Sequence, residues 1–235
     1  MIYKYLLVDF ADTIAELKPS REELIQRYTT EVTGISIETL KIGRIARTLD
    51  LIQPYSSVKT QSSTEKRDFY INYNTNLLSA LGVSHLGCRG VQMYEYFMSN
   101  SSHWTPKKDA PRVLSRLKEE GMGISVLSNF DGNLRDIMNI AGFDMDIFSN
   151  IFISQVIGLE KPNPAFLAYA IEKQKWSTSE TLSIGDSYTL DFIPARESGV
   201  DGIILDETNE YEHLEIALKD WDSIGDFLLC QKKKT

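Results

Sequence analysis

Five polar residues stand just beyond the ends of short apolar segments or in the loops beside them. They are Asp9, Ser128, Lys161, Asp186 and Asp191. The carboxyl ends of parallel strands meet at one edge of a sheet, so side chains that follow separate strands are expected to converge there. Carboxylates can hold Mg²⁺, and one of them can attack as a nucleophile, while an ammonium group and a hydroxyl neutralise phosphoryl oxygens. The set therefore predicts a site for a phosphorylated ligand.

The elements that must position these side chains alternate between strand and helix. Apolar runs that predict buried strands cover residues 3–9, 124–127, 151–154, 181–184 and 202–205. Helices are expected near 109–120, 132–141, 164–174 and 190–198, and the segment 211–229 is expected to be mostly helical. This alternation predicts an α/β fold with a doubly wound, Rossmann-like parallel sheet that has helices on both faces.

A helical block separates the first expected strand from the others. Ser20 and Glu23 have the spacing of a capping box at the start of a helix that runs to about Thr33. Further helices are expected over roughly 36–52, 64–81 and 88–99. We therefore expect a core domain of residues 1–15 and 101–235 and an inserted helical cap domain of residues 16–100. Such a block is either a lid over the sheet edge or a static subdomain.

Four motifs, in order, resemble those of the haloacid dehalogenase (HAD) superfamily of hydrolases. They are Asp9-Phe10-Ala11-Asp12-Thr13, Val126-Leu127-Ser128-Asn129, Gly158 to Pro164, and Gly185-Asp186-Ser187-Tyr188-Thr189-Leu190-Asp191. The helical block is similar in position to the cap of the subclass that carries one after the first motif. The resemblance extends over nearly the whole chain, and it implies a Mg²⁺-dependent phosphohydrolase acting on a small phosphorylated metabolite.

The resemblance also implies a nucleophile and a metal site. Asp9 would attack phosphorus and form an aspartyl-phosphate. Mg²⁺ would be bound by Asp9, by the backbone carbonyl of Ala11 and by Asp186, and Asp191 would reach it through water. A pair of carboxylates without a cation would repel, so Mg²⁺ in this position keeps the nucleophile ionised.

The same resemblance implies a phosphate-binding group. Ser128, Asn129 and neighbouring backbone N–H groups would hold the phosphoryl oxygens being transferred. Lys161 would balance the negative charge of both the phosphate and the nucleophile Asp9. Ser128 and Lys161 are accordingly expected to take part in catalysis together with Asp9.

Ala11 departs from the family pattern. Phosphatases of the family usually have an aspartate two residues after the nucleophile, which protonates the leaving alcohol and then activates water. General acid–base help is worth roughly 10²–10⁴-fold, so its loss penalises alkyl phosphates most and aryl phosphates least.

Three interpretations of this position stay open. Asp12, or a carboxyl group of the cap, supplies the proton instead. Alternatively the chain is similar to phosphonatases, which have Ala at this position and use a cap lysine as a Schiff base, for which Lys41, Lys59 and Lys66 are available. In the third interpretation the chain is a catalytically weak or inactive binding or regulatory protein. A metal-free dehalogenase is disfavoured because it does not need the acidic fourth motif.

The charge and the cysteine content of the chain limit which partners and which compartment are expected. The 235 residues carry 33 acidic and 25 basic side chains, a formal charge of −8 that repels nucleic acids and anionic membranes. Cys88 and Cys230 form no CxxC motif, which favours a reducing compartment and no zinc site. No run approaches the ~20 apolar residues of a membrane span, and no signal peptide is recognisable. We expect a cytoplasmic monomer or homodimer that binds neither nucleic acid nor membrane.

Overall fold

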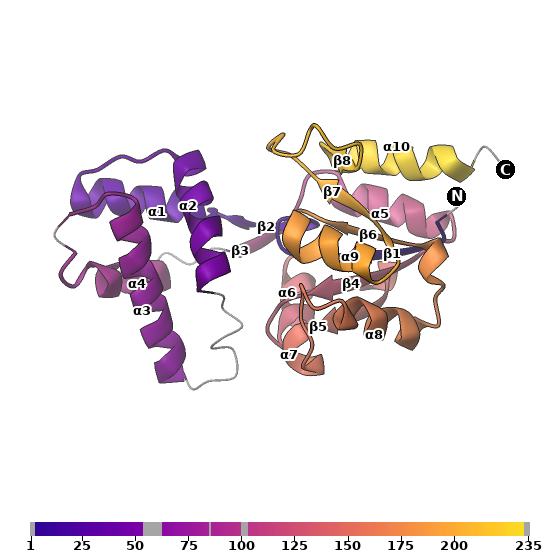
Figure 1. The fold of residues 1–235 in the computed structure, drawn as a ribbon, viewed down its shortest axis with the longest axis horizontal. Helices are drawn as coiled ribbons and strands as arrows, with labels where there is room; N and C mark the ends of the chain where they lie inside the picture. The colour runs from indigo at the N-terminus through magenta and orange to yellow at the C-terminus, as the bar shows by residue number, and fades with distance from the viewer. Residues whose placement is uncertain (1–2, 54–62, 85, 100–102, 233–235) are drawn as a thin grey trace. The chain divides into compact units, whose positions relative to one another are not determined.

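The computed structural model describes residues 3–53, 63–84, 86–99 and 103–232 (Figure 1). The chain divides into two compact units, Met1–Glu16 with Trp104–Thr235 and Leu17–His103. We call them the α/β unit and the helical unit. Their boundaries fall at 16–17 and 103–104, whereas the sequence-based boundaries are 15–16 and 100–101.

The α/β unit is built on a six-stranded sheet in the order β5-β4-β1-β6-β7-β8. The bounds in that order are Phe148–Ile153, Gly123–Ser128, Tyr5–Val8, Thr181–Gly185, Asp201–Leu205 and Ala217–Leu218. Every neighbouring pair in this sheet is parallel, which confirms the predicted doubly wound fold. The chain moves outward from β1 through β4 to β5 and then returns to β6 on the other side of β1. The order therefore reverses at β1, where folds of this kind place their ligands.

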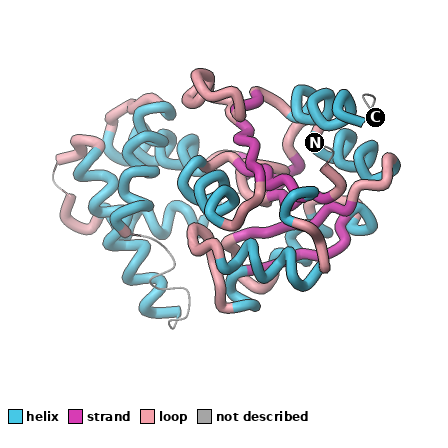
Figure 2. Tube along the Cα trace, turned by 45° about the vertical axis from the view of Figure 1, so that its right-hand side comes forward, coloured by secondary structure: helices cyan, strands magenta, loops and turns pink. Residues whose placement is uncertain are grey.

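Helices cover both faces of this sheet (Figure 2). Alternate residues of β1 belong to different hydrophobic clusters and so face opposite sides of the sheet. Leu6 and Val8 pack in one cluster with α5 (Ala110–Glu119), α6 (Leu134–Ile140) and α10 (Trp221–Lys232). Leu7 packs in a second cluster with α8 (Ala165–Gln174) and α9 (Ile193–Glu197). The short α7 (Ser154–Ile157) follows β5 directly. Because β1 is buried on both faces, its apolar run is unbroken.

The helical unit has a hydrophobic core of its own. The unit consists of α1 (Arg21–Tyr28), α2 (Thr39–Ile52), α3 (Ser63–Ala80) and α4 (Arg89–Ser99), with a π-helical turn, Thr29–Thr33, after α1. The predicted capping box is present, since the Glu23 N–H donates to Ser20 Oγ at 3.1 Å and the Ser20 N–H donates to Glu23 Oε2 at 2.8 Å.

Two short strands were not predicted. β2 (Ala15–Lys18) and β3 (His103–Pro106) pair as a two-stranded sheet at the points where the chain passes between its two units.

The prediction of a mostly helical segment over 211–229 is wrong in its first half. The chain there forms turns and β8, and helix α10 begins only at Trp221. The buried Asp206 carboxylate accepts the N–H groups of Glu210 at 2.9 Å and Tyr211 at 2.8 Å, which holds the backbone in a loop. The helix expected over 190–198 is likewise a π-helical turn, Tyr188–Phe192, followed by the short α9. Among the described residues, no helix is both long enough and apolar enough to span a membrane.

Candidate active site

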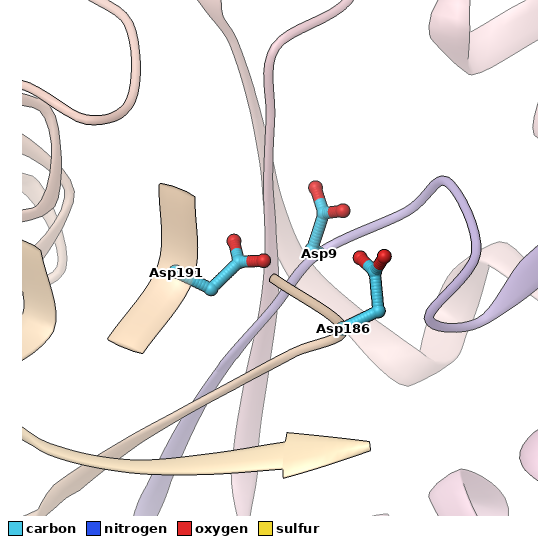
Figure 3. A group of neighbouring side chains, drawn as sticks. All are labelled: Asp9, Asp186 and Asp191. Atoms are coloured by element: carbon cyan, nitrogen blue, oxygen red, sulfur yellow. The ribbon is translucent and has the colours of Figure 1, made fainter. Parts of the chain in front are cut away.

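Three carboxylates meet where the sheet order reverses (Figure 3). Asp9 directly follows β1, Asp186 directly follows β6, and Asp191 lies in the π-helical turn after it. Strands β1 and β6 end level with one another, because Val8 pairs with Ile184 and the Asp9 N–H donates to the Ile184 carbonyl at 2.9 Å. One oxygen from each of the three carboxylates lies within 4.8 Å of the other two.

The Lys161 ammonium group bridges two of these carboxylates. Its Nζ lies 2.7 Å from Asp9 Oδ1 and 2.6 Å from Asp191 Oδ1, and all three side chains are buried. The backbone of Lys161 is fixed by Asn129, whose Oδ1 accepts the Lys161 N–H at 2.8 Å and whose Nδ2 donates to the Lys161 carbonyl at 2.7 Å. Asn129 thus positions the backbone of Lys161.

The cluster carries an excess of negative charge. Three carboxylates and one ammonium group sum to −2 when all are ionised. Burial raises the pKa of Asp9 to about 6, with a further rise from Asp191, although Lys161 opposes it. Burial and the charges of Asp191 and Asp9 raise the pKa of Asp186 well above its ordinary value. Burial alone would lower the pKa of Lys161, but Asp191 and Asp9 outweigh it and raise that pKa, so the lysine stays protonated.

Two further contacts hold the acidic side chains in place, and sequence reasoning did not identify them. The Thr13 hydroxyl donates to Asp186 Oδ1 at 3.3 Å, and the Ser187 N–H donates to Asp191 Oδ2 at 3.1 Å. Thr13 closes the first motif, which is the only local signal that could have indicated its role.

Gly185 allows Asp191 to approach the end of β6. A Cβ atom at position 185 would lie 2.1 Å from Asp191 Cγ and 2.4 Å from Asp191 Cβ, closer than real Cβ atoms come to any other heavy atom. The glycine of the fourth motif is therefore required by packing against the carboxylate.

Asp12 has a left-handed backbone conformation, with φ of 55°. Glycine adopts this conformation freely and aspartate tolerates it better than most residues, which explains why Asp12 can stand where the family usually has Gly. Its side chain is exposed. Ala11 is half-buried and packs against the same cluster as Phe10, so position 11 presents a methyl group and no titratable atom.

The other predicted residues are placed as follows. Ser128 is the last residue of β4 and is buried beside β1. Lys41 and Lys66 lie on α2 and α3 of the helical unit, and Lys59 lies outside the described residues. The structure thus gathers Asp9, Lys161, Asp186 and Asp191 into one cluster.

The donor set of this cluster fits Mg²⁺. Mg²⁺ takes oxygen ligands, and proteins usually supply it with one or two carboxylates and leave the remaining positions to water and phosphate oxygens. Three carboxylates around one ammonium group leave a charge of −2, which a divalent cation neutralises. A bound cation would also reverse the effect of burial on the carboxylate pKa values.

Comparisons with known proteins show which sequences and structures this chain resembles. A sequence model of the haloacid dehalogenase-like hydrolases matches residues 3–199. Haloacid dehalogenase-like hydrolase domain-containing protein 3 from Danio rerio is 30% identical over 115 residues, 48% of this chain and 47% of that protein. The chain therefore spans about half the length of this relative. Sesquiterpene phosphatase AstK from Aspergillus oryzae is 22% identical over 125 residues, 53% of this chain and 63% of that protein.

The fold is shared with solved structures. The HAD-hydrolase YfnB from Bacillus subtilis, solved bound to magnesium, superimposes with a TM-score of 0.67 at 22% identity, covering 97% of this chain and 99% of that chain.

Proposed function

The chain belongs to the haloacid dehalogenase-like hydrolases, and on that premise we propose that it is a Mg²⁺-dependent phosphohydrolase of a small phosphorylated metabolite. The observation that carries the proposal is the ammonium group of Lys161, which bridges Asp9 and Asp191 beside Asp186. The phosphatase among the relatives supports phosphate chemistry.

Asp9, the carbonyl of Ala11 and Asp186 would hold Mg²⁺, and Asp191 would reach it through water. When bound, Mg²⁺ would supply positive charge that offsets the phosphoryl oxygens and the carboxylates.

The chain's own residues then divide the reaction between them. A carboxylate oxygen of Asp9 attacks phosphorus, the bond from phosphorus to the ester oxygen breaks, and an aspartyl-phosphate forms. The ester oxygen departs with the bonding electron pair as an alkoxide or phenolate and takes its proton from water. Lys161, at 2.7 Å, keeps Asp9 ionised and offsets charge on the phosphoryl oxygens, to which Ser128 donates. Water next attacks the aspartyl-phosphate, which releases inorganic phosphate and restores the Asp9 carboxylate.

Ala11 favours a second candidate function, that of a binding or regulatory protein with slow turnover. Position 11 offers no proton to the leaving alcohol and no base to the attacking water. Aryl phosphates, whose leaving groups need little protonation, should therefore be the better substrates, and release of phosphate from Asp9 should be the slow step.

Hydrolysis of para-nitrophenyl phosphate tests the proposal. We expect phosphate release that depends on Mg²⁺, with a burst of one equivalent of nitrophenol before a slower steady state. Asp9→Asn should abolish both phases, and Asp136→Asn, which changes an exposed aspartate on α6, should leave them intact. Activity that survives Asp9→Asn would refute the enzyme proposal. Binding of Mg²⁺ and inorganic phosphate without any burst would favour the binding protein.

A further inference from the structure

The helical unit contains a cavity of about 550 Å³. None of its described lining residues belongs to the carboxylate cluster. Its described lining comes entirely from this unit, chiefly from α1, α3 and α4. Cavities of roughly 300–1,000 Å³ are typical of small-molecule sites. The volume is therefore suited to a molecule of several rings.

The walls of this cavity are mostly apolar and aromatic. Phe69, Tyr73 and Leu77 contribute from α3, and Tyr94 and Phe97 contribute from α4. Aromatic side chains prefer offset-stacked or edge-on contacts with other rings. A flat, ring-bearing molecule therefore matches these walls.

Two ionic groups of the lining, Arg21 and Asp50, are paired with one another. Arg21 Nη2 lies 3.1 Å from Asp50 Oδ2 and donates to the Tyr73 hydroxyl at 3.0 Å. That hydroxyl in turn donates to Asp50 Oδ1 at 2.7 Å. The charges of Arg21 and Asp50 offset each other. However, Lys66 and Arg67 also line the cavity, so the described lining disfavours a cationic ligand.

Asn74 is a buried polar residue of the lining, and it differs from Arg21, Asp50 and Tyr73 in having no such contact within the described part of the chain. Its side chain lines the cavity, the residue is only 4% exposed, and no described residue hydrogen-bonds to its amide. Buried polar side chains nearly always have partners, and an unpaired one calls for a group that is supplied from elsewhere. An amide offers both donors and an acceptor, so a hydroxyl, a carbonyl or an amide of a ligand can pair with it.

We propose that this cavity binds a small, ring-bearing molecule whose hydroxyl, carbonyl or amide group pairs with Asn74. No residue of the carboxylate cluster is among the described lining residues, so this binding can be measured on protein that carries Asp9→Asn. Its failure would therefore leave the proposed phosphohydrolase activity unaffected.

Titration of the 235-residue protein with β-naphthol and with naphthalene tests the proposal. Asn74→Leu keeps the side-chain volume and removes the amide, so we expect it to weaken β-naphthol binding about fivefold, equivalent to about 1 kcal/mol, and not to weaken naphthalene binding. Asn72→Leu, an exposed position on the same helix, is the matched control and should change neither affinity. Absence of β-naphthol binding, or equal losses for the two probes, would overturn the proposal.

Thermal unfolding separates this role from a structural one. Because the amide has no partner among the described residues, Asn74→Leu should not lower the midpoint of the ligand-free protein. A fall of more than about 4 °C, the shift expected for about 1 kcal/mol at this chain length, would show that Asn74 serves the fold and would contradict the proposal.

Kinetics with β-naphthyl phosphate distinguish two sources of the ligand, and this part rests on the proposed function. A raised KM with unchanged kcat in Asn74→Leu would identify the ligand as the alcohol portion of a substrate. An unchanged KM, together with weakened β-naphthol binding, would identify a separate small molecule.

Discussion

Substitution of Gly185 by alanine tests whether the position of Asp191 is set by the end of β6. The new Cβ would lie 2.1 Å from Asp191 Cγ and 2.4 Å from its Cβ, so a change of rotamer alone cannot remove the overlap. Asp191 must move as a whole, which breaks its contact with Lys161 Nζ at 2.6 Å and with the Ser187 N–H at 3.1 Å.

The structure sets the size of the effect. Breaking a buried ion pair by displacing one partner typically costs 3–5 kcal/mol, and because Lys161 keeps its contact with Asp9 we expect a value near the lower end, about 3 kcal/mol. For a chain of this length each kcal/mol lowers the unfolding midpoint by about 2–4 °C, so Gly185→Ala should lower it by roughly 6–12 °C. Phosphate release should fall by at least about tenfold, since the displaced Asp191 no longer holds Lys161 from its second side and no longer reaches the proposed Mg²⁺ site.

A second substitution isolates the clash. Asp191→Gly removes the carboxylate and its Cβ, so Gly185→Ala should cost less than about 1 kcal/mol in that background, and the two substitutions should be strongly non-additive. Gly43→Ala on α2 is the control, because its Cβ would meet no atom closer than 3.6 Å and a helical alanine is favoured over glycine. Equal costs of Gly185→Ala in the two backgrounds, measured by thermal and denaturant unfolding, would refute the reasoning.

Two other predictions concern protons at the site. In metal-free protein the pKa of Asp9 is raised to about 6, mainly by burial. Ionisation of Asp9 therefore destabilises the folded state as the pH rises from about 4 through 6, and the loss of stability reaches about 3 kcal/mol. Unfolding midpoints of Asp9→Asn should therefore fall less over that range, and parallel curves would contradict this. Ala11→Asp supplies the missing base and should raise steady-state turnover of para-nitrophenyl phosphate at least about tenfold while removing the burst, whereas lower turnover would show that another group acts in its place.

The sequence was most informative where structure depends on local pattern. Ser20 and Glu23 of the capping box are three positions apart, and an unbroken apolar run that ends at Asp9 predicts β1. The convergence of the carboxylates follows from parallel topology, since strand ends that are far apart in the sequence must share one edge.

Contacts between distant segments could not be predicted from such patterns. Asn129 holds the backbone of Lys161 across 32 positions, and nothing in either segment encodes that pairing. β2 is a four-residue strand whose sequence, Ala-Glu-Leu-Lys, suits a helix equally well, so its pairing with β3 decides its conformation. The loop at 206–216 is likewise set by one buried carboxylate, Asp206, rather than by periodicity.

The two halves of the proposed reaction place different demands on this site. Attack on phosphorus requires an ionised Asp9 beside a cation, and the contact with Lys161 at 2.7 Å meets that demand without any contribution from position 11. Release of phosphate requires a base for water, and the methyl group of Ala11 provides none. With a good leaving group the first half is therefore fast relative to the second, and the phosphorylated form of Asp9 should accumulate during turnover. Quenching the protein with acid during the steady state and counting protein-bound phosphate measures that form: close to one phosphate per chain is expected, and a value near zero would mean that water is activated by a group other than residue 11.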